Sequence, residues 1–261
     1  EVNQPVGPGA HAITKDLVPF GPHHCQGSCC GVPALETFVV ITIILVTVGL
    51  IVVAHYLDEK RKKALMEWPQ ARRLSFRPDR DDSMGSRYPN FEFLNRGSAR
   101  YAYNIIQGKH KMHPMCAFDY HYETYSTDSK GHRHTHHHHF SVVVVEANVP
   151  LKPLLIRGET FLDKVGEFMG FDDIDFELAE FSRRFHVKSP DRRWAFDVLH
   201  QQAMEFLLAS PVFTLQFHDR HVAAYRNSVF STEHVEAALD VVAGLLNRLP
   251  NSVLRELKGT N

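Results

Sequence analysis

The sequence lacks an excess of charge of either sign. Lysine and arginine together number 29, against 30 aspartates and glutamates, which gives a formal net charge of −1. Proteins that bind nucleic acid usually show a clear basic excess, because their side chains neutralise phosphates. The composition therefore indicates no nucleic acid among the partners of this protein.

The sequence also lacks the short motifs that mark common active sites. It contains no nucleophile elbow, phosphate-binding loop, dinucleotide fingerprint or zinc-protease helix motif. No serine or cysteine has a sequence context that marks it as a nucleophile. These absences make an enzyme the less favoured class without excluding one, because activity belongs to sites and not to folds.

Cysteine is scarce and unevenly placed. Three of the four cysteines, Cys25, Cys29 and Cys30, lie in one short stretch, and Cys116 lies far downstream. If that stretch is exported, we expect a disulfide through Cys25, because adjacent cysteines form only a strained bridge. The third thiol would then be available to a partner. Metal binding together with the two preceding histidines is the alternative, although the spacing matches no common zinc pattern.

One uncharged apolar run dominates the sequence. Thr37–Ala54 contains 18 residues without a charged side chain. A helix needs about 20 apolar residues to cross the ~30 Å hydrocarbon core of a bilayer. The alternatives are a buried core helix, which is rarely apolar on all sides, and a buried strand, which is rarely so long. We therefore expect a transmembrane helix over residues 35–57.

Positive charge is nearly absent before this run and concentrated after it. Residues 1–36 contain one lysine, Lys15, and no arginine, whereas residues 60–63 are all basic. The positive-inside rule predicts an N-terminus outside and a C-terminal part in the cytoplasm, in a bacterial cytoplasmic membrane. The first residue, Glu1 in place of methionine, fits a removed signal peptide or a fragment.

The segments on either side of the predicted span are expected to make contacts outside a folded core. Residues 1–34 are rich in proline and glycine, which predicts an extended arm that is either a floppy tail or ordered by a partner. Residues 58–98 are predicted to form a basic juxtamembrane segment and a linker. Five side chains in the juxtamembrane segment fit contact with anionic lipid headgroups: Lys60, Arg61, Lys62, Lys63 and Trp68. A simple topology anchor is the alternative.

The predicted span has one face suited to helix contact. Thr42 and Gly49 lie seven residues apart, which places them on nearly the same side of a helix. Small and hydroxyl-bearing residues allow close approach of a second helix in a membrane. These two residues are therefore candidate contacts with another membrane subunit.

The remaining sequence, residues 99–261, is predicted to form a cytoplasmic α+β domain. A short strand is expected over residues 74–77, before this domain, and further strands over residues 99–107, 115–125, 132–147, 152–157 and 181–187, with a hairpin over 212–226. Helices are expected over residues 160–169, 190–209 and 232–249, the last capped by Ser231 or Thr232. The fold class is thus α+β: one transmembrane helix followed by a mostly antiparallel sheet with packed helices. Val142–Val145 is apolar at every position, so both faces of the sheet should be covered there.

The strand predicted over residues 132–147 is unusually rich in histidine. Six of the 18 histidines lie within residues 132–139. A turn centred on Ser129 would place five candidate metal ligands on one face: Asp119, His121, Glu123, His137 and His139. Imidazoles and carboxylates are ligands for Zn²⁺, Mn²⁺ or Fe²⁺. A register slip of one residue would reverse this grouping, and the alternative is a solvated or partner-facing strand.

Several stretches resemble a known group of proteins. They are KRKKALMEWPQARR after the apolar run, FDYHYETYSTDSKG and HFSVVVV in the strands, and GFDDIDFELAEFSRRFHVKSPDRRWAFDVLHQQAMEFLL beyond them. Over residues 37–250 the chain resembles uncharacterised bacterial single-span membrane proteins with a C-terminal domain of unknown function. The resemblance implies an anchored domain and assigns no activity or functional residue.

Three functions fit these patterns. The first is a membrane-anchored interaction module, an accessory or scaffold subunit of a larger membrane complex, with lipid and other membrane subunits as partners. The second is a metal-binding protein or metal-dependent enzyme that uses the histidine-rich strand. The third is a pH sensor in which the charging of histidines changes contacts of the sheet.

Overall fold

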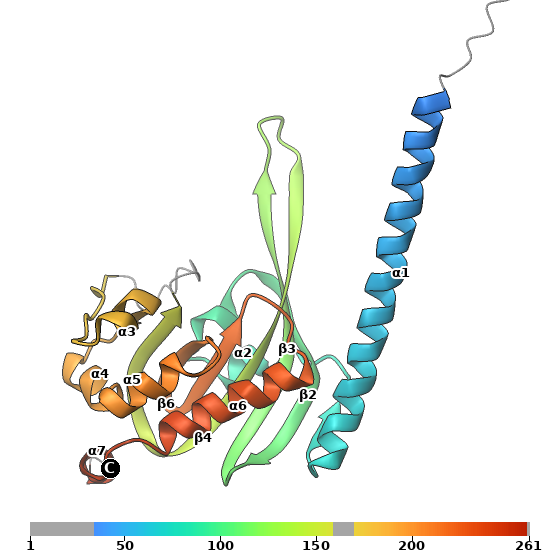
Figure 1. Ribbon diagram of the computed structural model, residues 1–261. Coiled ribbons are helices and arrows are strands. Elements are labelled where there is room, and N and C mark those ends of the chain that lie inside the picture. Colours follow the sequence, from blue (N-terminus) through green and yellow to red (C-terminus); the bar gives the residue numbers. More distant parts are fainter. Residues whose placement is uncertain (1–33, 159–169, 260–261) are drawn as a thin grey trace, which may run out of the picture. The chain divides into compact units, whose positions relative to one another are not determined.

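The computed structural model describes residues 34–158 and 170–259 (Figure 1). The predicted N-terminal arm, the thiols of Cys25, Cys29 and Cys30, and the helix predicted over residues 160–169 lie outside this range. The chain divides into two compact units, Glu1–Val52 and Val53–Asn261, and the second is called the domain below.

Helix α1, Ala34–Ala71, contributes residues to both units. Its apolar part contains an 18-residue window with a mean hydropathy of 2.9, and none of that window is buried. By length and composition, this helix is able to cross a membrane. The helix continues beyond the predicted end at residue 57, because residues 58–71 contain good helix formers and Pro69 comes only in its last turn.

The domain is built on one antiparallel sheet of six strands. They are β1 Ser75–Arg77, β2 Ser98–His110, β3 His113–Thr127, β4 Arg133–Gly158, β5 Phe185–Lys188 and β6 Thr214–Arg226. The strand order is β1-β2-β3-β4-β5, and β6 pairs with β4 as well. Strand β4 is long enough to pair with β3 near its start, with β5 near its end, and with β6 along its other edge.

Short helices cover the sheet. They are α2 Met84–Arg87, the 3₁₀ helix η1 Glu92–Asn95, α3 Ala179–Arg184, α4 Arg192–Val198, α5 Gln201–Leu208, α6 Thr232–Leu246 and α7 Asn251–Gly259. Ser231 caps α6 as predicted, because its hydroxyl accepts from the backbone N–H of His234. The structure confirms an α+β fold in which one apolar helix precedes a mostly antiparallel sheet with packed helices.

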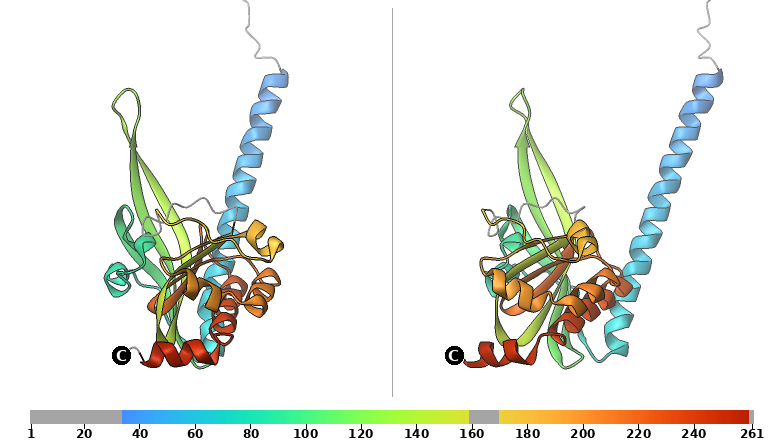
Figure 2. Two further views of the ribbon diagram at one scale, coloured as in Figure 1. Left: turned by 90° about the vertical axis from the view of Figure 1, so that its left-hand side faces the viewer. Right: turned by 60° about the vertical axis from the view of Figure 1, so that its left-hand side comes forward.

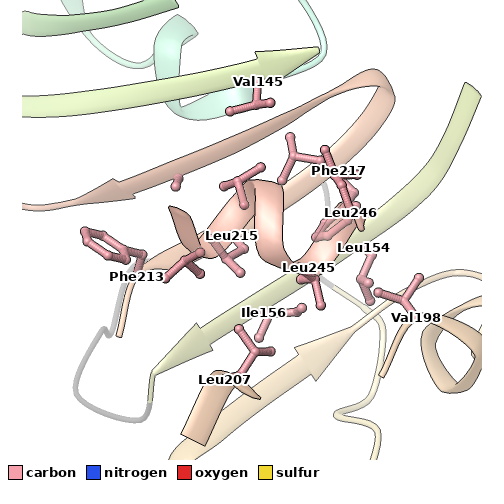
Figure 3. Packing of buried hydrophobic residues seen from close by; sticks show 14 of the residues in the cluster. Val145, Leu154, Ile156, Val198, Leu207, Phe213, Leu215, Phe217, Leu245 and Leu246 are labelled. Atoms are coloured by element: carbon pink, nitrogen blue, oxygen red, sulfur yellow. The ribbon is translucent and has the colours of Figure 1, made fainter. Parts of the chain in front are cut away.

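Helices lie on opposite faces of the sheet (Figure 2), and a hydrophobic core lies on each face. The larger core joins one face to helices α3–α7, and Figure 3 shows Leu154 and Ile156 of β4 packed there with Leu245 of α6. The smaller core joins the other face to α2 and η1. Val143 and Val145 belong to the first core, and Val142 and Val144 to the second. The prediction that both faces are covered at Val142–Val145 is confirmed.

The segment predicted to be a linker is part of the domain. Met84, Phe91, Phe93 and Leu94 are at most 2% exposed and form much of the smaller core. Proline, glycine and aspartate in this segment set its irregular backbone, but its apolar side chains are buried all the same. The domain boundary predicted at residue 99 is therefore too late in the chain.

The hairpin predicted over residues 212–226 is one continuous strand. Strand β6 runs antiparallel to β4 from Thr214 to Arg226, and Asp219 adopts a φ of 50° within it. The β4–β6 register shifts twice between Glu146 and Leu154. The extra residues at both shifts lie in β4, which bulges there and passes through its prolines without interrupting the sheet. The predicted turn is a kink in a strand.

Two further elements differ from their predicted form. The helix predicted over residues 190–209 is two helices, because the backbone leaves the helical region at Leu199 and His200. The strand predicted over residues 181–187 begins as helix α3 and becomes β5 only at Phe185. Burial of Trp194, Phe181 and neighbouring side chains against the sheet outweighs the local pattern in both places.

Candidate functional site

The face of the sheet that carries the larger core becomes polar along β3 and β4. Ala117 and Val143 are the last core residues of this row, and they pair directly. The following pairs on the same face are Asp119 with Ser141, His121 with His139, and Glu123 with His137. All five predicted ligands therefore share one face. The turn is centred one residue later than predicted, so each residue of β3 pairs with a residue two places further along β4. A shift of two residues keeps the same side chains on the same face of the sheet.

Asp119 is used inside the domain and is not grouped with the metal-ligating side chains. Its two carboxylate oxygens accept hydrogen bonds from Arg61 Nη2, both at 2.8 Å, and one accepts from Asn104 Nδ2 at 2.8 Å. The Ser141 hydroxyl donates a further bond to this carboxylate. The Asp119 side chain is 4% exposed, and a buried carboxylate requires such partners. Sequence reasoning missed this network.

The network also changes the role expected of α1 after the apolar run. Arg61 Nε donates to the backbone carbonyl of Phe230 at 2.8 Å, so the guanidinium points into the domain. Trp68 likewise packs against the larger core, and Arg72 stacks over its ring at 4.5 Å. Of the five side chains predicted to contact headgroups, Arg61 and Trp68 instead contact residues of the domain.

The three lysines of the same cluster remain on the exposed side of α1. The Lys62 ammonium lies 2.8 Å from Asp58 and 3.0 Å from Glu59, and Lys63 lies 3.8 Å from Glu67. Lys60 is exposed as well. Surface pairs of this kind contribute little to stability, so these lysines stay available to other partners.

His121 is held in one tautomer at the buried end of the histidine row. The residue is 4% exposed, and its Nδ1 lies 3.1 Å from the backbone carbonyl oxygen of Ala99. A carbonyl only accepts, so Nδ1 carries a proton, and in the neutral form of the ring the lone pair is on Nε2. The Tyr101 ring covers His121 with a centroid distance of 4.6 Å, and Arg80 lies over Tyr101 at 4.1 Å. The ring is therefore fixed in orientation.

His137 and Glu123 complete a cluster around this lone pair. His137 Nδ1 lies 3.3 Å from His121 Nε2 and 3.3 Å from Glu123 Oε1. The other Glu123 oxygen accepts from the Tyr125 hydroxyl at 3.0 Å. One ligand atom from each of His121, Glu123 and His137 lies within 4.8 Å of the other two. This three-residue set is called the histidine–glutamate cluster below.

His139 lies beside the cluster and has a different partner. Its Nδ1 lies 3.3 Å from the Tyr103 hydroxyl, and its ring centroid lies 4.7 Å from that of His121. Partial loss of hydration and the nearby imidazoles of His121 and His137 lower the pKa of His139 below its usual range. His139 is therefore mostly neutral at neutral pH.

Three further histidines of the run contact residues of the hairpin between β3 and β4. His136 Nε2 lies 2.7 Å from the Ser126 hydroxyl, and His132 and His134 approach the Asp128 carboxylate at 3.1 and 3.4 Å. Asp128 also accepts from two backbone N–H groups of the turn. These histidines have hydrogen-bonding partners within the hairpin and stabilise its turn, so their presence is explained without a bound metal.

A cavity lies on the opposite face of the sheet. It has a volume of about 350 Å³, and its lining includes Tyr88, Cys116, Glu146 and His221. Burial raises the pKa of the Cys116 thiol, so the thiol stays protonated at neutral pH and is a poor nucleophile. Burial also lowers the pKa of His221. The cavity thus contains no activated nucleophile among the residues that line it.

The comparisons with known proteins give one structural relative. No protein-family model matches the chain, and no curated protein does. The crystal structure of the mycobacterial trehalose monomycolate transport factor A, TtfA, is similar, with a TM-score of 0.53 at 10% sequence identity. The similarity covers 72% of this chain and 95% of that chain. The two chains therefore share a fold.

Proposed function

We propose that this protein is a membrane-anchored accessory subunit of a larger membrane complex, with α1 as its single span. The apolar part of α1 is uncovered in the described structure, which supports a role in contacting lipid or another helix. TtfA, which shares the fold, is a mycobacterial trehalose monomycolate transport factor. Membrane transport proteins are accordingly the class of partner that we favour, and the exposed lysines at residues 60, 62 and 63 are proposed headgroup contacts.

The observation that carries the proposal is the attachment of α1 to the domain. A helix that serves only as an anchor needs no specific bonds to the domain that follows it. Here Arg61, on the same helix as the apolar run, bonds to the buried Asp119 and to the Phe230 carbonyl. Leu65 of the same helix is 3% exposed and belongs to the larger core. The C-terminal part of α1 is thus a component of the domain, which suits a subunit whose span and domain both take part in docking.

The proposed orientation has the N-terminus outside and the domain in the cytoplasm, as the charge distribution around the apolar run favours. We expect a membrane-impermeant maleimide added to intact cells, after mild reduction, to label this protein through Cys25, Cys29 or Cys30. Cys116 provides an internal control, because it is buried and reacts only after unfolding. Labelling only after cell lysis would contradict the orientation.

The partner contact is tested by enlarging Gly49. Nothing in the described structure lies within 4 Å of a side-chain carbon placed at this residue, so leucine fits the chain itself. Overpacking of a close helix contact costs roughly 1–3 kcal/mol. We expect Gly49→Leu to reduce recovery of the partner about tenfold in native co-purification, because each 1.4 kcal/mol changes an affinity about tenfold.

Thr47→Leu is the matched control, since it introduces the same side chain two residues away and therefore on the opposite side of the helix. The Thr47 hydroxyl donates only to the Ile43 carbonyl of its own helix, at 2.7 Å. Equal recovery of partners with both variants would argue against the Thr42 and Gly49 face. A wild-type chain that elutes alone after gentle extraction would refute the accessory role.

A further inference from the structure

We propose that the histidine–glutamate cluster is a binding site for a divalent transition metal of the zinc type. His121 Nε2, His137 Nδ1 and one Glu123 carboxylate oxygen are the three ligand atoms, and a fourth position is open to solvent. The site is independent of the proposed accessory role, because it belongs to the domain and involves no partner.

Two of the three distances between ligand atoms of the cluster match those that a metal requires. Metal–ligand bonds of about 2.0–2.2 Å at tetrahedral angles separate the ligand atoms by roughly 3.3–3.6 Å. His137 Nδ1 lies 3.3 Å from both His121 Nε2 and Glu123 Oε1. The third pair of ligand atoms, from His121 and Glu123, lies within 4.8 Å, so a small movement of the partly exposed Glu123 carboxylate closes the set around one ion.

The balance of hydrogen-bond donors and acceptors in the cluster also favours the binding of a cation. His121 Nε2 presents a lone pair, because Nδ1 donates to Ala99, and the Glu123 carboxylate presents another. His137 Nδ1 lies close to both of these acceptors. It carries at most one proton, so it cannot donate a hydrogen bond to each of them. A divalent ion satisfies all three atoms at once, releasing the His137 proton to solvent.

The surroundings orient two of the three ligands. The bond from His121 Nδ1 to the Ala99 carbonyl fixes the tautomer and the ring, as the second partner of a metal-bound histidine usually does. The Tyr125 hydroxyl positions Glu123 through its second oxygen. Two imidazoles and one carboxylate select zinc-type ions over Mg²⁺ and Ca²⁺, which prefer sites made of oxygen ligands only.

The position of the cluster predicts a structural effect. Strand β2 pairs with β3 only as far as Glu123, and β6 pairs with β4 only from Ser141. Beyond these residues, β3 and β4 form a two-stranded ribbon, which Figure 1 shows extending from the sheet. A metal held by residues of both strands links them at the base of this ribbon. Its binding should therefore protect amide hydrogens of the ribbon from exchange.

The test uses the full chain in detergent, purified without a metal-affinity step, and titrated with Zn²⁺ against a competing chelator. We expect one tight equivalent, whose affinity falls at least about tenfold in Glu123→Gln and in His137→Ala. In the wild type, Zn²⁺ should slow hydrogen exchange in the ribbon, and in these variants it should not. Both substituted side chains are at the partly open end of the site, so the fold is expected to survive.

The matched control is the double variant His134→Ala, His136→Ala, which removes two imidazoles from the opposite face of the same strand. It should keep the tight equivalent and the exchange protection. An equal loss in the control and the site variants would show collective binding by the histidine run and overturn the proposal. So would a wild-type chain that retains less than about a tenth of an equivalent.

Discussion

Replacing Asp119 with alanine is expected to lower the free energy of unfolding of the domain by about 3 kcal/mol, at the lower end of losses for broken buried ion pairs. The substitution leaves the Arg61 guanidinium, whose side chain is 18% exposed, without its carboxylate. Asn104 and Ser141 lose an acceptor as well. For a domain of this size, the loss corresponds to a fall in melting temperature of roughly 6–12 °C. Thermal unfolding in mild detergent, followed by the fluorescence of Trp68 and Trp194, measures it.

Arg72→Ala provides the control, because Arg72 lies on the same helix and also contacts both oxygens of one carboxylate, that of Glu236, at 2.8 Å. Both side chains of that pair are about 40% exposed, at 39% and 41%, so its loss should cost less than about 1 kcal/mol. A double-mutant cycle of Arg61→Ala with Asp119→Ala tests the coupling directly. Strictly additive effects would contradict the network as the source of the loss.

Replacing Gly97 with alanine is expected to destabilise the domain by about 2–4 kcal/mol, through backbone strain and a clash together. Gly97 has a φ of 62°, which favours glycine. A Cβ at this residue would lie 2.2 Å from the backbone oxygen of Glu123 and 2.9 Å from the Tyr122 ring. The clash falls where β2 begins to pair with β3, at Ser98 and Glu123. The same fluorescence-monitored unfolding measures the effect.

Gly131→Ala separates strain from clash. Gly131 has a φ of 86°, but no atom of the described residues lies within 4 Å of a Cβ built there. Only the conformational cost remains, and it should amount to about 1 kcal/mol. If the two glycine variants lose the same stability, contact with the Glu123 backbone has no role in holding β2 against β3.

The strands could be predicted from the sequence because the alternation of apolar and polar residues and the positions of turn residues indicate the same boundaries. Asp128, Ser129 and Gly131 mark the turn between β3 and β4, and the apolar positions of both strands follow the period of a sheet. This placed the five candidate ligands on one face even though the register differed. Turn chemistry was absent between β2 and β3, where Lys111 and Met112 both adopt positive φ without being glycine or asparagine.

Polar contacts between residues far apart in the chain could not be predicted from the sequence. Arg61 resembles its basic neighbours in sequence, and only the fold shows that it meets Asp119. One signal was present: Asp119 interrupts an apolar stretch between Phe118 and Tyr120, and a charge at a buried position needs a partner. That signal requires a buried cation but does not say which of the many basic residues supplies it. The histidine–glutamate cluster was partly predicted because its members are local to one hairpin.

Strand β4 also decides the order in which the domain can be assembled. Its pairing with β3 is local and forms early, whereas its pairing with β6 joins residues as distant as Ser141 and Arg226. During synthesis, one edge of a 26-residue strand therefore stays unpaired until the chain has been extended past Arg226. An open edge of that length is a template for misassembly with other chains. Completion of β6 is thus the event that covers this edge of β4 between Ser141 and Ile156.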